Sequence, residues 1–235
     1  MGASKKKTAA ARAPKARKKP APGKPDAGLK ARARRIAKLV IADHPDAHCM
    51  LDHGSPFELL IATILAAQCT DERVNLVTPD LFARYPTPQA LASADTSELE
   101  KMVRTTGFFR SKAKSIHGAA EALASRFAGA FPDRMEDLVS LPGVGRKTAN
   151  VVLGVCFGQP AIIVDTHVRR VAQRLGIVTS DEPDEIERQI QAVLPRDQWT
   201  AFSHALTFHG RRRCHARKPD HEGCVLRALC DSRDL

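Results

Sequence analysis

From Leu29 onward, the hydrophobic and polar positions follow the pattern of helices. Ser55, Pro56 and Glu58 form a helix start, with serine as the N-cap, proline at the first helical position and glutamate three residues after the serine. The segment that follows, residues 59–67, is nearly all apolar, which suits a helix buried at the centre of an all-α domain. Alternation with a period of two is absent, and the one strand candidate, residues 161–164, is too short and isolated to build a sheet. The sequence therefore predicts an all-α fold made of many short helices.

Two further helix starts are predicted from the same pairing of a capping residue with a glutamate three positions later. Asp95 precedes Glu98, and Asp133 precedes Glu136. We therefore expect one helix to begin directly after Asp95 and another directly after Asp133.

The excess of positive charge is concentrated at the N-terminus. The 235-residue chain has a formal net charge of +11, and residues 1–28 contribute +8 of it, through nine Lys or Arg and one acid, Asp26. No large apolar residue lies between Met1 and Leu29, so burial cannot offset the entropy of ordering this segment, and we expect it to be disordered. Two roles stay open for it: loose, salt-dependent contact with DNA phosphates, or a solubilising or targeting extension. The chain has no secretory h-region and no apolar run of ~18 residues, so the sequence predicts no membrane span.

Residues 141–145, Leu-Pro-Gly-Val-Gly, lie between two segments that are predicted to be helical. Two glycines one residue apart let the backbone adopt positive φ and approach a ligand closely. The helix that starts near Arg146 then presents free N–H groups and the positive end of its dipole to an anion, which is how a protein holds a DNA phosphate without reading sequence. A plain turn between two helices is the alternative, and the glycine pattern alone does not decide between the two.

Lys147 and Asp165 are the candidate reactive residues. Lys147 falls in the first turn of the helix after the glycines, where a lysine serves either as a phosphate contact or as a nucleophile. We expect desolvation, the helix N-terminus and Arg146 to favour the neutral, nucleophilic amine. Asp165 is well placed as the N-cap of the next helix. Its carboxylate would also stabilise positive charge developing on a sugar and help to deprotonate the lysine, if one oxygen caps the helix and the other faces a cleft.

These segments, taken together and in order, resemble the helix-hairpin-helix DNA glycosylases and, within them, the endonuclease III family. The resemblance is carried by residues 141–150, Leu-Pro-Gly-Val-Gly-Arg-Lys-Thr-Ala-Asn, and by residues 164–167, Val-Asp-Thr-His. Residues 55–62, 67–71 and 209–211 also match the pattern of that family, so the resemblance covers about Leu29 to Cys230. It implies a helical barrel domain with the hairpin over residues 49–159. It also implies an iron–sulfur domain made of residues 29–48 and 160–235, with damaged double-stranded DNA in the cleft between the two.

The resemblance also implies a reaction. The enzyme flips an oxidised pyrimidine out of the duplex, because chemistry on a base requires that the base leaves the stack. Lys147 attacks C1′, expels the base and forms a Schiff base, and β-elimination then cuts the strand 3′ to the lesion. No redox cofactor is needed for this chemistry. Relatives that only remove a base lack the lysine at this position, so its presence supports the lyase step.

Flipping leaves a gap in the base stack, and the resemblance implies which residues fill it. Gln68 would plug the gap and Phe108 would wedge beside the orphaned base, although the wedge position is usually aliphatic, and a core aromatic is the alternative for Phe108. His167 would lie near the pocket, or would cap its own helix, and Asp71 would brace the site. The residues expected to contact DNA are Gln68, Phe108, Leu141, Gly143, Val144, Gly145, Arg146, His167 and Arg211.

Clustered cysteines at the C-terminus indicate a metal site rather than disulfides. Members of the endonuclease III family have four cysteines spaced C-x₆-C-x₂-C-x₅-C, and here Cys214, His221, Cys224 and Cys230 occupy that spacing. Three interpretations compete: histidine as a ligand of a [4Fe–4S] cluster, a zinc site with three cysteines and one histidine, or loss of the metal. The preserved spacing favours the cluster, which would order a basic loop from Arg211 to Lys218 against DNA. His215 is a weaker alternative ligand.

Two other functional classes stay open beside the bifunctional enzyme. A glycosylase for mispaired adenine, or another enzyme that only removes a base, would use the same hairpin, but the adenine class usually carries an extra C-terminal domain. A damage-binding protein without catalysis would need only the hairpin and the basic tail, whereas this chain has both Lys147 and Asp165. We expect a monomer that acts in the cytoplasm at the nucleoid, and a nuclear or mitochondrial location stays open because of the basic tail.

Overall fold

The computed structural model describes residues 25–127 and 130–234, and all regular secondary structure within them is helical. The predicted all-α fold is confirmed. The expected disorder of residues 1–28 falls almost wholly outside the described residues. The α-helices are α1 (Ala27–Asp43), α2 (Pro56–Leu65), α3 (Asp71–Arg84), α4 (Pro88–Ala92), α5 (Thr96–Met102), α6 (Phe109–Arg126), α7 (Met135–Val139), α8 (Arg146–Cys156), α9 (Thr166–Arg174), α10 (Pro183–Val193) and α11 (Trp199–Arg212). Three short 3-10 helices are η1 (Arg104–Thr106), η2 (Arg196–Gln198) and η3 (Arg227–Leu229).

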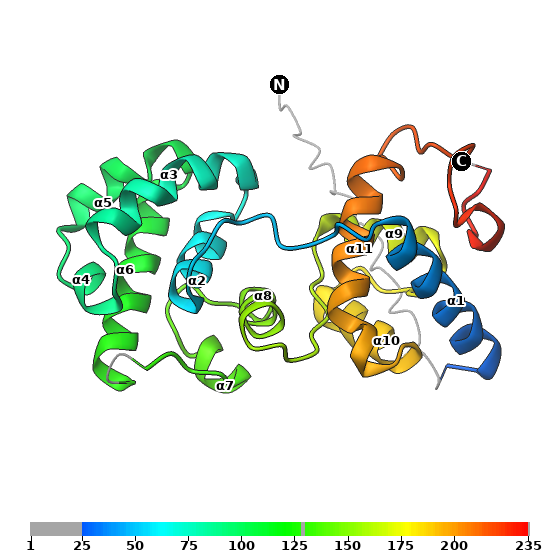
Figure 1. Cartoon of the computed structure of the whole chain (residues 1–235), viewed down its shortest axis with the longest axis horizontal. Helices are drawn as coiled ribbons and strands as arrows, with labels where there is room; N and C mark the ends of the chain where they lie inside the picture. The colour runs from blue at the N-terminus through cyan, green and yellow to red at the C-terminus, as the bar shows by residue number, and fades with distance from the viewer. Residues whose placement is uncertain (1–24, 128–129, 235) are drawn as a thin grey trace, which may run out of the picture.

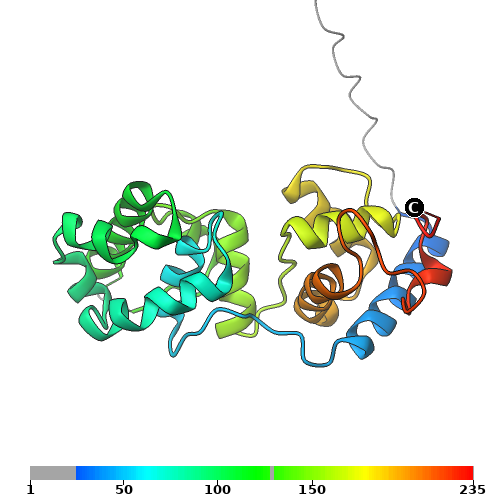
Figure 2. The same ribbon diagram turned by 90° about the horizontal axis from the view of Figure 1, so that it is seen from above.

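The helices form two lobes, which Figure 1 shows side by side. The first lobe contains α2 to α8 around one hydrophobic core, and the second contains α1 and α9 to α11, with the C-terminal segment, around another. The view from above in Figure 2 shows that the chain crosses between the lobes twice, once after α1 and once after α8. The domain bounds expected from the sequence stay a prediction.

The segment predicted as an isolated strand candidate joins the two cores instead. Residues 161–164 are extended but form no strand. Ile163 packs into the core of the first lobe, whereas Ile162 and Val164 pack into the core of the second, because alternate side chains of an extended chain point in opposite directions. Side chains satisfy the backbone hydrogen bonds of this segment. The amide of Ile163 donates to Oγ of Ser203 at 3.0 Å, and the carbonyl of Ile162 accepts a hydrogen bond from the side chain of Asn150.

The helix starts that were predicted from capping residues are confirmed in two cases of three. Ser55 accepts a hydrogen bond from the amide of Glu58 at 3.2 Å, and α2 beyond it is buried along most of its length between α3, α6 and α8. Asp95 caps α5 in the same way. The predicted start directly after Asp133 is wrong, because α7 begins at Met135 and its N-cap residue, Arg134, makes no side-chain capping hydrogen bond. The carbonyl of Asp133 instead accepts a hydrogen bond from the side chain of Gln159 at 2.7 Å, a contact that fixes the extended chain there.

Within the described ranges, no helix is both long enough and apolar enough to cross a membrane.

Candidate active-site cleft and metal pocket

A cleft of about 680 Å³ lies between the two lobes. The first lobe contributes the turn between α2 and α3 and the first turn of α8. The second lobe contributes the start of α9 and one face of α11. Six of the residues expected at the site line it together: Gln68, Asp71, Lys147, Asp165, His167 and Arg211. Phe108 and the hairpin residues 141–146 do not line it.

Lys147 and Asp165 reach the cleft from opposite lobes. Lys147 is exposed in the first turn of α8. Oδ1 of Asp165 caps α9 by accepting a hydrogen bond from the amide of Val168 at 2.6 Å. Oδ2 accepts a hydrogen bond from the hydroxyl of Thr207, on α11, at 3.1 Å. One oxygen of the carboxylate therefore caps the helix, and the other is held by Thr207 in the lining of the cleft.

Thr207 is a residue that the sequence analysis missed. It lies 42 positions after Asp165 and carries no motif of its own, so only the packing of α9 against α11 brings the two together.

The hairpin presents its backbone rather than its side chains. Leu141 and Val144 are 3% and 7% exposed, so neither side chain is free to contact a ligand. Gly143 has φ of 74°, as expected. Gly145 has φ of −94°, so of the two glycines Gly143 is the one that uses positive φ. A Cβ on Gly145 would meet nothing within 4 Å, which leaves the close approach of a ligand as the reason for glycine there.

Arg146 points away from Lys147 and into the second lobe. Its guanidinium donates two hydrogen bonds of 2.8 Å to Glu187 of α10, whose side chain is 5% exposed. Asn150 donates to the same carboxylate at 3.1 Å. The idea that Arg146 acts as a free cation beside the lysine is therefore wrong, because a carboxylate neutralises it. Glu187 itself was missed, since nothing near it in the sequence marks it as a partner of the hairpin.

A second ion pair joins the lobes on the other side of the cleft. Arg211 on α11 pairs with Asp71 at the start of α3, with an N–O distance of 2.6 Å. The guanidinium expected to contact DNA is therefore already engaged within the protein. His167 contacts Arg170 at 3.1 Å, and burial lowers the pKa of His167, so the neutral imidazole is favoured in the cleft wall.

Gln68 and Phe108 share an uncommon backbone conformation. Their φ values are 53° and 48°, and among the described residues no other non-glycine residue has positive φ. Phe108 is 67% exposed, so the alternative that it is a core aromatic is wrong. Both side chains stand on the surface, Gln68 in the cleft and Phe108 ahead of α6.

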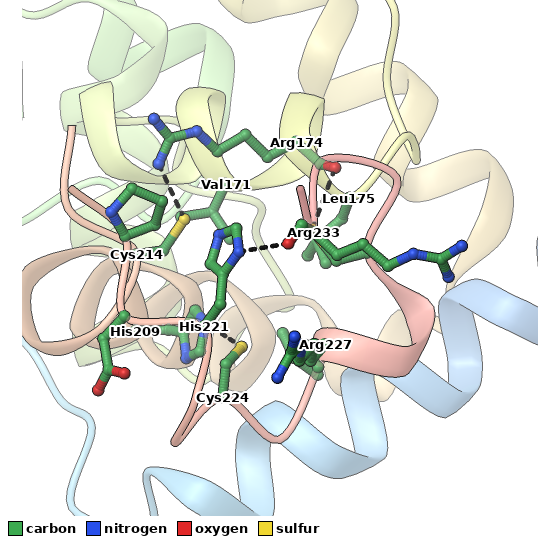
Figure 3. A pocket seen from close by; sticks show the side chains of 13 residues that line it. Val171, Arg174, Leu175, His209, Cys214, His221, Cys224, Arg227 and Arg233 are labelled. Carbon is green, nitrogen blue, oxygen red and sulfur yellow. Dashed lines mark hydrogen bonds between the residues drawn. The ribbon is translucent and has the colours of Figure 1, made fainter. Parts of the chain in front are cut away.

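The four candidate metal ligands line a single pocket at the C-terminal end of the chain, whereas His215 does not line it. Figure 3 shows Cys214, His221 and Cys224 around this pocket. Nδ1 of His221 lies 2.5 Å from the carbonyl oxygen of Arg233, which fixes the tautomer with the proton on Nδ1 and leaves Nε2 as a free lone pair. Burial raises the pKa values of Cys224 and Cys230, so their thiolates need a cation nearby.

Among the described residues, the ligand atoms of Asp43, His44 and His209 lie within 4.8 Å of one another, and His209 also lines this pocket.

Comparison with known proteins gives consistent results. The family described as "HhH-GPD superfamily base excision DNA repair protein" matches residues 61–196. Endonuclease III of Synechocystis sp. is 50% identical over 207 residues, which cover 88% of this chain and 94% of that protein. Endonuclease III of Bacillus subtilis is 44% identical over 187 residues, covering 79% and 85%. The solved structure of a trapped endonuclease III–DNA covalent intermediate, an estranged-adenine complex, superposes with a TM-score of 0.83 at 43% identity and covers 87% of this chain and 96% of that one.

Proposed function

Because the chain belongs to the HhH-GPD superfamily of base excision DNA repair proteins, we propose that it removes oxidised pyrimidines from duplex DNA and then cuts the strand 3′ to the abasic site. It is a DNA glycosylase and abasic-site lyase that binds damaged double-stranded DNA. The observation that carries the proposal is the placement of Lys147 and Asp165 in one cleft, on opposite lobes.

In the proposed reaction, the amine of Lys147 bonds to C1′ of the damaged nucleotide as the bond between C1′ and the base breaks. The electron pair of that bond leaves with the base, and Asp165 stabilises the positive charge that develops on the sugar. The nitrogen loses a proton, the bond between C1′ and the ring oxygen O4′ breaks, and O4′ takes up a proton, which leaves a Schiff base between Lys147 and C1′. Loss of a proton from C2′ expels the 3′ phosphate, which cuts the strand. Thr207 supports this role of Asp165, because its hydroxyl holds the oxygen that is not used to cap α9.

DNA binding in this proposal is divided between backbone and side chains. The backbone from Gly143 to Gly145 and the free amides of α8 would hold a phosphate, in keeping with the buried side chains of Leu141 and Val144. Gln68 and Phe108 would fill the gap left by the flipped base, in keeping with their exposure. The lobes would correspond to a barrel domain, residues 49–159, and a second domain, residues 29–48 and 160–235, as two separate cores support.

Proteins of the endonuclease III family generally carry a [4Fe–4S] cluster, and we propose that Cys214, His221, Cys224 and Cys230 hold one here. Their common pocket supports it. The hydrogen bond from His221 to Arg233 supports histidine as a ligand, because metal-bound imidazoles donate their other N–H in this way. When bound, the cluster would supply a rigid anchor for the basic loop from Arg211 to Lys218.

Metal analysis tests the ligand set. Anaerobically purified protein should contain about four irons and four sulfides per chain, and His221→Cys should retain them. His221→Ala should lose iron, whereas the control His215→Ala should not, because His215 is exposed outside the pocket. Zinc without iron in the parent protein would contradict the proposal.

Assays on defined duplexes test the function. The protein should excise thymine glycol and leave a cut strand without alkali treatment, and it should also cut at a preformed abasic site. A duplex with adenine opposite 8-oxoguanine should stay intact. Base removal that yields a cut only after alkali would instead indicate an enzyme without lyase activity.

A further inference from the structure

The two residues expected to enter the base stack are held in a strained conformation. Gln68 and Phe108 both lie in the left-handed region, which is unfavourable for a residue that carries a Cβ. Such conformations persist only where the surrounding contacts determine them, and they cluster at functional sites. The contacts that hold these two turns in place are therefore part of how the site works.

The ammonium of Lys112 holds the carbonyl that lies just before the Phe108 turn. It donates a hydrogen bond to the carbonyl of Thr106 at 2.6 Å. The backbone amide of Lys112 donates to the carbonyl of Phe108 at 3.0 Å, as the amide of any residue at this helical position would, so the contact specific to lysine is the one to Thr106.

The position of Lys112 is costly for a lysine. The residue is 5% exposed, and lysine is rarely buried without a charged partner. Burial lowers its pKa. A methionine would fill the same space without this desolvation cost. Packing alone therefore gives no reason for an ammonium beside the Phe108 turn.

We propose that Lys112 is a positioning residue that holds the Phe108 turn in the shape that enters the duplex. Its buried ammonium, bonded to the carbonyl of Thr106, fixes this turn before DNA binds. The proposal rests on the proposed function, in which Gln68 and Phe108 occupy the gap left by the flipped base. It assigns Lys112 no contact with the reacting atoms.

The test separates wedge placement from chemistry by using two substrates. A duplex with thymine glycol requires the wedge, whereas a single-stranded oligonucleotide with an abasic site has no partner strand and no base to flip. In Lys112→Met, we expect single-turnover excision from the duplex to fall on the order of 10- to 100-fold, since displacement of a positioned group by about 1 Å has effects of that size. Borohydride trapping on the single strand should stay within about twofold of the parent protein. Lys114→Met is the matched control, because Lys114 is exposed on the same helix.

A double-mutant cycle tests whether Lys112 acts through the wedge. If it does, Lys112→Met should change duplex excision by no more than about threefold when Phe108→Ala is already present, since residues that act as a unit are not additive. Equal losses on both substrates, additive effects in the cycle, or full duplex activity of Lys112→Met would each overturn the proposal. If the melting temperature shows that Lys112→Met does not fold, Lys112→Gln takes its place in the same cycle. Failure of the proposed function is distinguishable, because the parent protein would then cut neither substrate.

Discussion

Glu187 is the residue whose loss should reveal how strongly the two lobes are held together. Its carboxylate, 5% exposed, accepts two hydrogen bonds of 2.8 Å from Arg146 and further bonds of 3.1 Å from Asn150 and Gln191. Glu187→Gln keeps the size of the side chain, but it removes the charge and turns an amide N–H₂ toward the guanidinium. Breaking a buried ion pair costs about 3–5 kcal/mol. Because the side chain of Arg146 is 45% exposed and regains water, we expect roughly 2–3 kcal/mol here.

Thermal unfolding followed by circular dichroism measures this loss. For a chain of this size, 1 kcal/mol shifts the melting temperature by about 2–4 °C, so Glu187→Gln should lower it by roughly 5–10 °C. The control is Glu185→Gln on the same helix, whose partner Arg188 is 68% exposed, and it should change the melting temperature by less than ~2 °C. If the melting temperature of Glu187→Gln stays within ~2 °C of the parent protein, the buried carboxylate and the hydrogen bonds that it accepts do not stabilise the fold as reasoned here.

Three further outcomes follow from the site. Gly143→Ala should destabilise the fold by about 1–3 kcal/mol, because φ is 74° and the new Cβ would lie 2.5 Å from that of Ser115. Gly145→Ala should instead keep the melting temperature and weaken duplex binding in a titration, and the reverse ranking of the two variants would contradict the two backbone geometries. Burial and nearby His48 lower the pKa of His204 below 6.5, so His204 is protonated in the unfolded chain before it is protonated in the folded protein. The free energy of unfolding should therefore fall as the pH drops below about 6.5. In urea titrations, His204→Gln should flatten this pH dependence, and an unchanged slope would count against the role of His204. Asp165→Asn should bind the duplex normally yet remove bases far more slowly, and near-normal turnover would reduce Asp165 to a helix cap.

The local features of the fold could be predicted from the sequence because they depend on neighbours in the chain. The N-caps at Ser55 and Asp165 are made with an amide three residues later, so a short motif contains all the information. Asp133 has the same motif, but a hydrogen bond from Gln159, 26 positions away, fixes its backbone outside the helix. A local pattern does not contain such a distant competitor.

The contacts that shape the site could not be predicted, because they join residues far apart in the sequence. Arg146 reads as a free cation beside the hairpin, but its partner Glu187 lies 41 positions later on the other lobe. Lys112 reads as one more lysine on a helix, and only its burial beside the Phe108 turn distinguishes it from Lys114. Both depend on how helices pack, which periodicity does not specify.

Borohydride trapping tests most directly whether Lys147 is the nucleophile in the cleft. With a duplex that carries thymine glycol, the parent protein should give a covalent protein–DNA adduct after reduction of the Schiff base, and Lys147→Gln should bind the duplex but give none. Peptide mapping of the adduct should place the sugar on Lys147. An adduct that persists in Lys147→Gln, or maps to another lysine, would contradict the account.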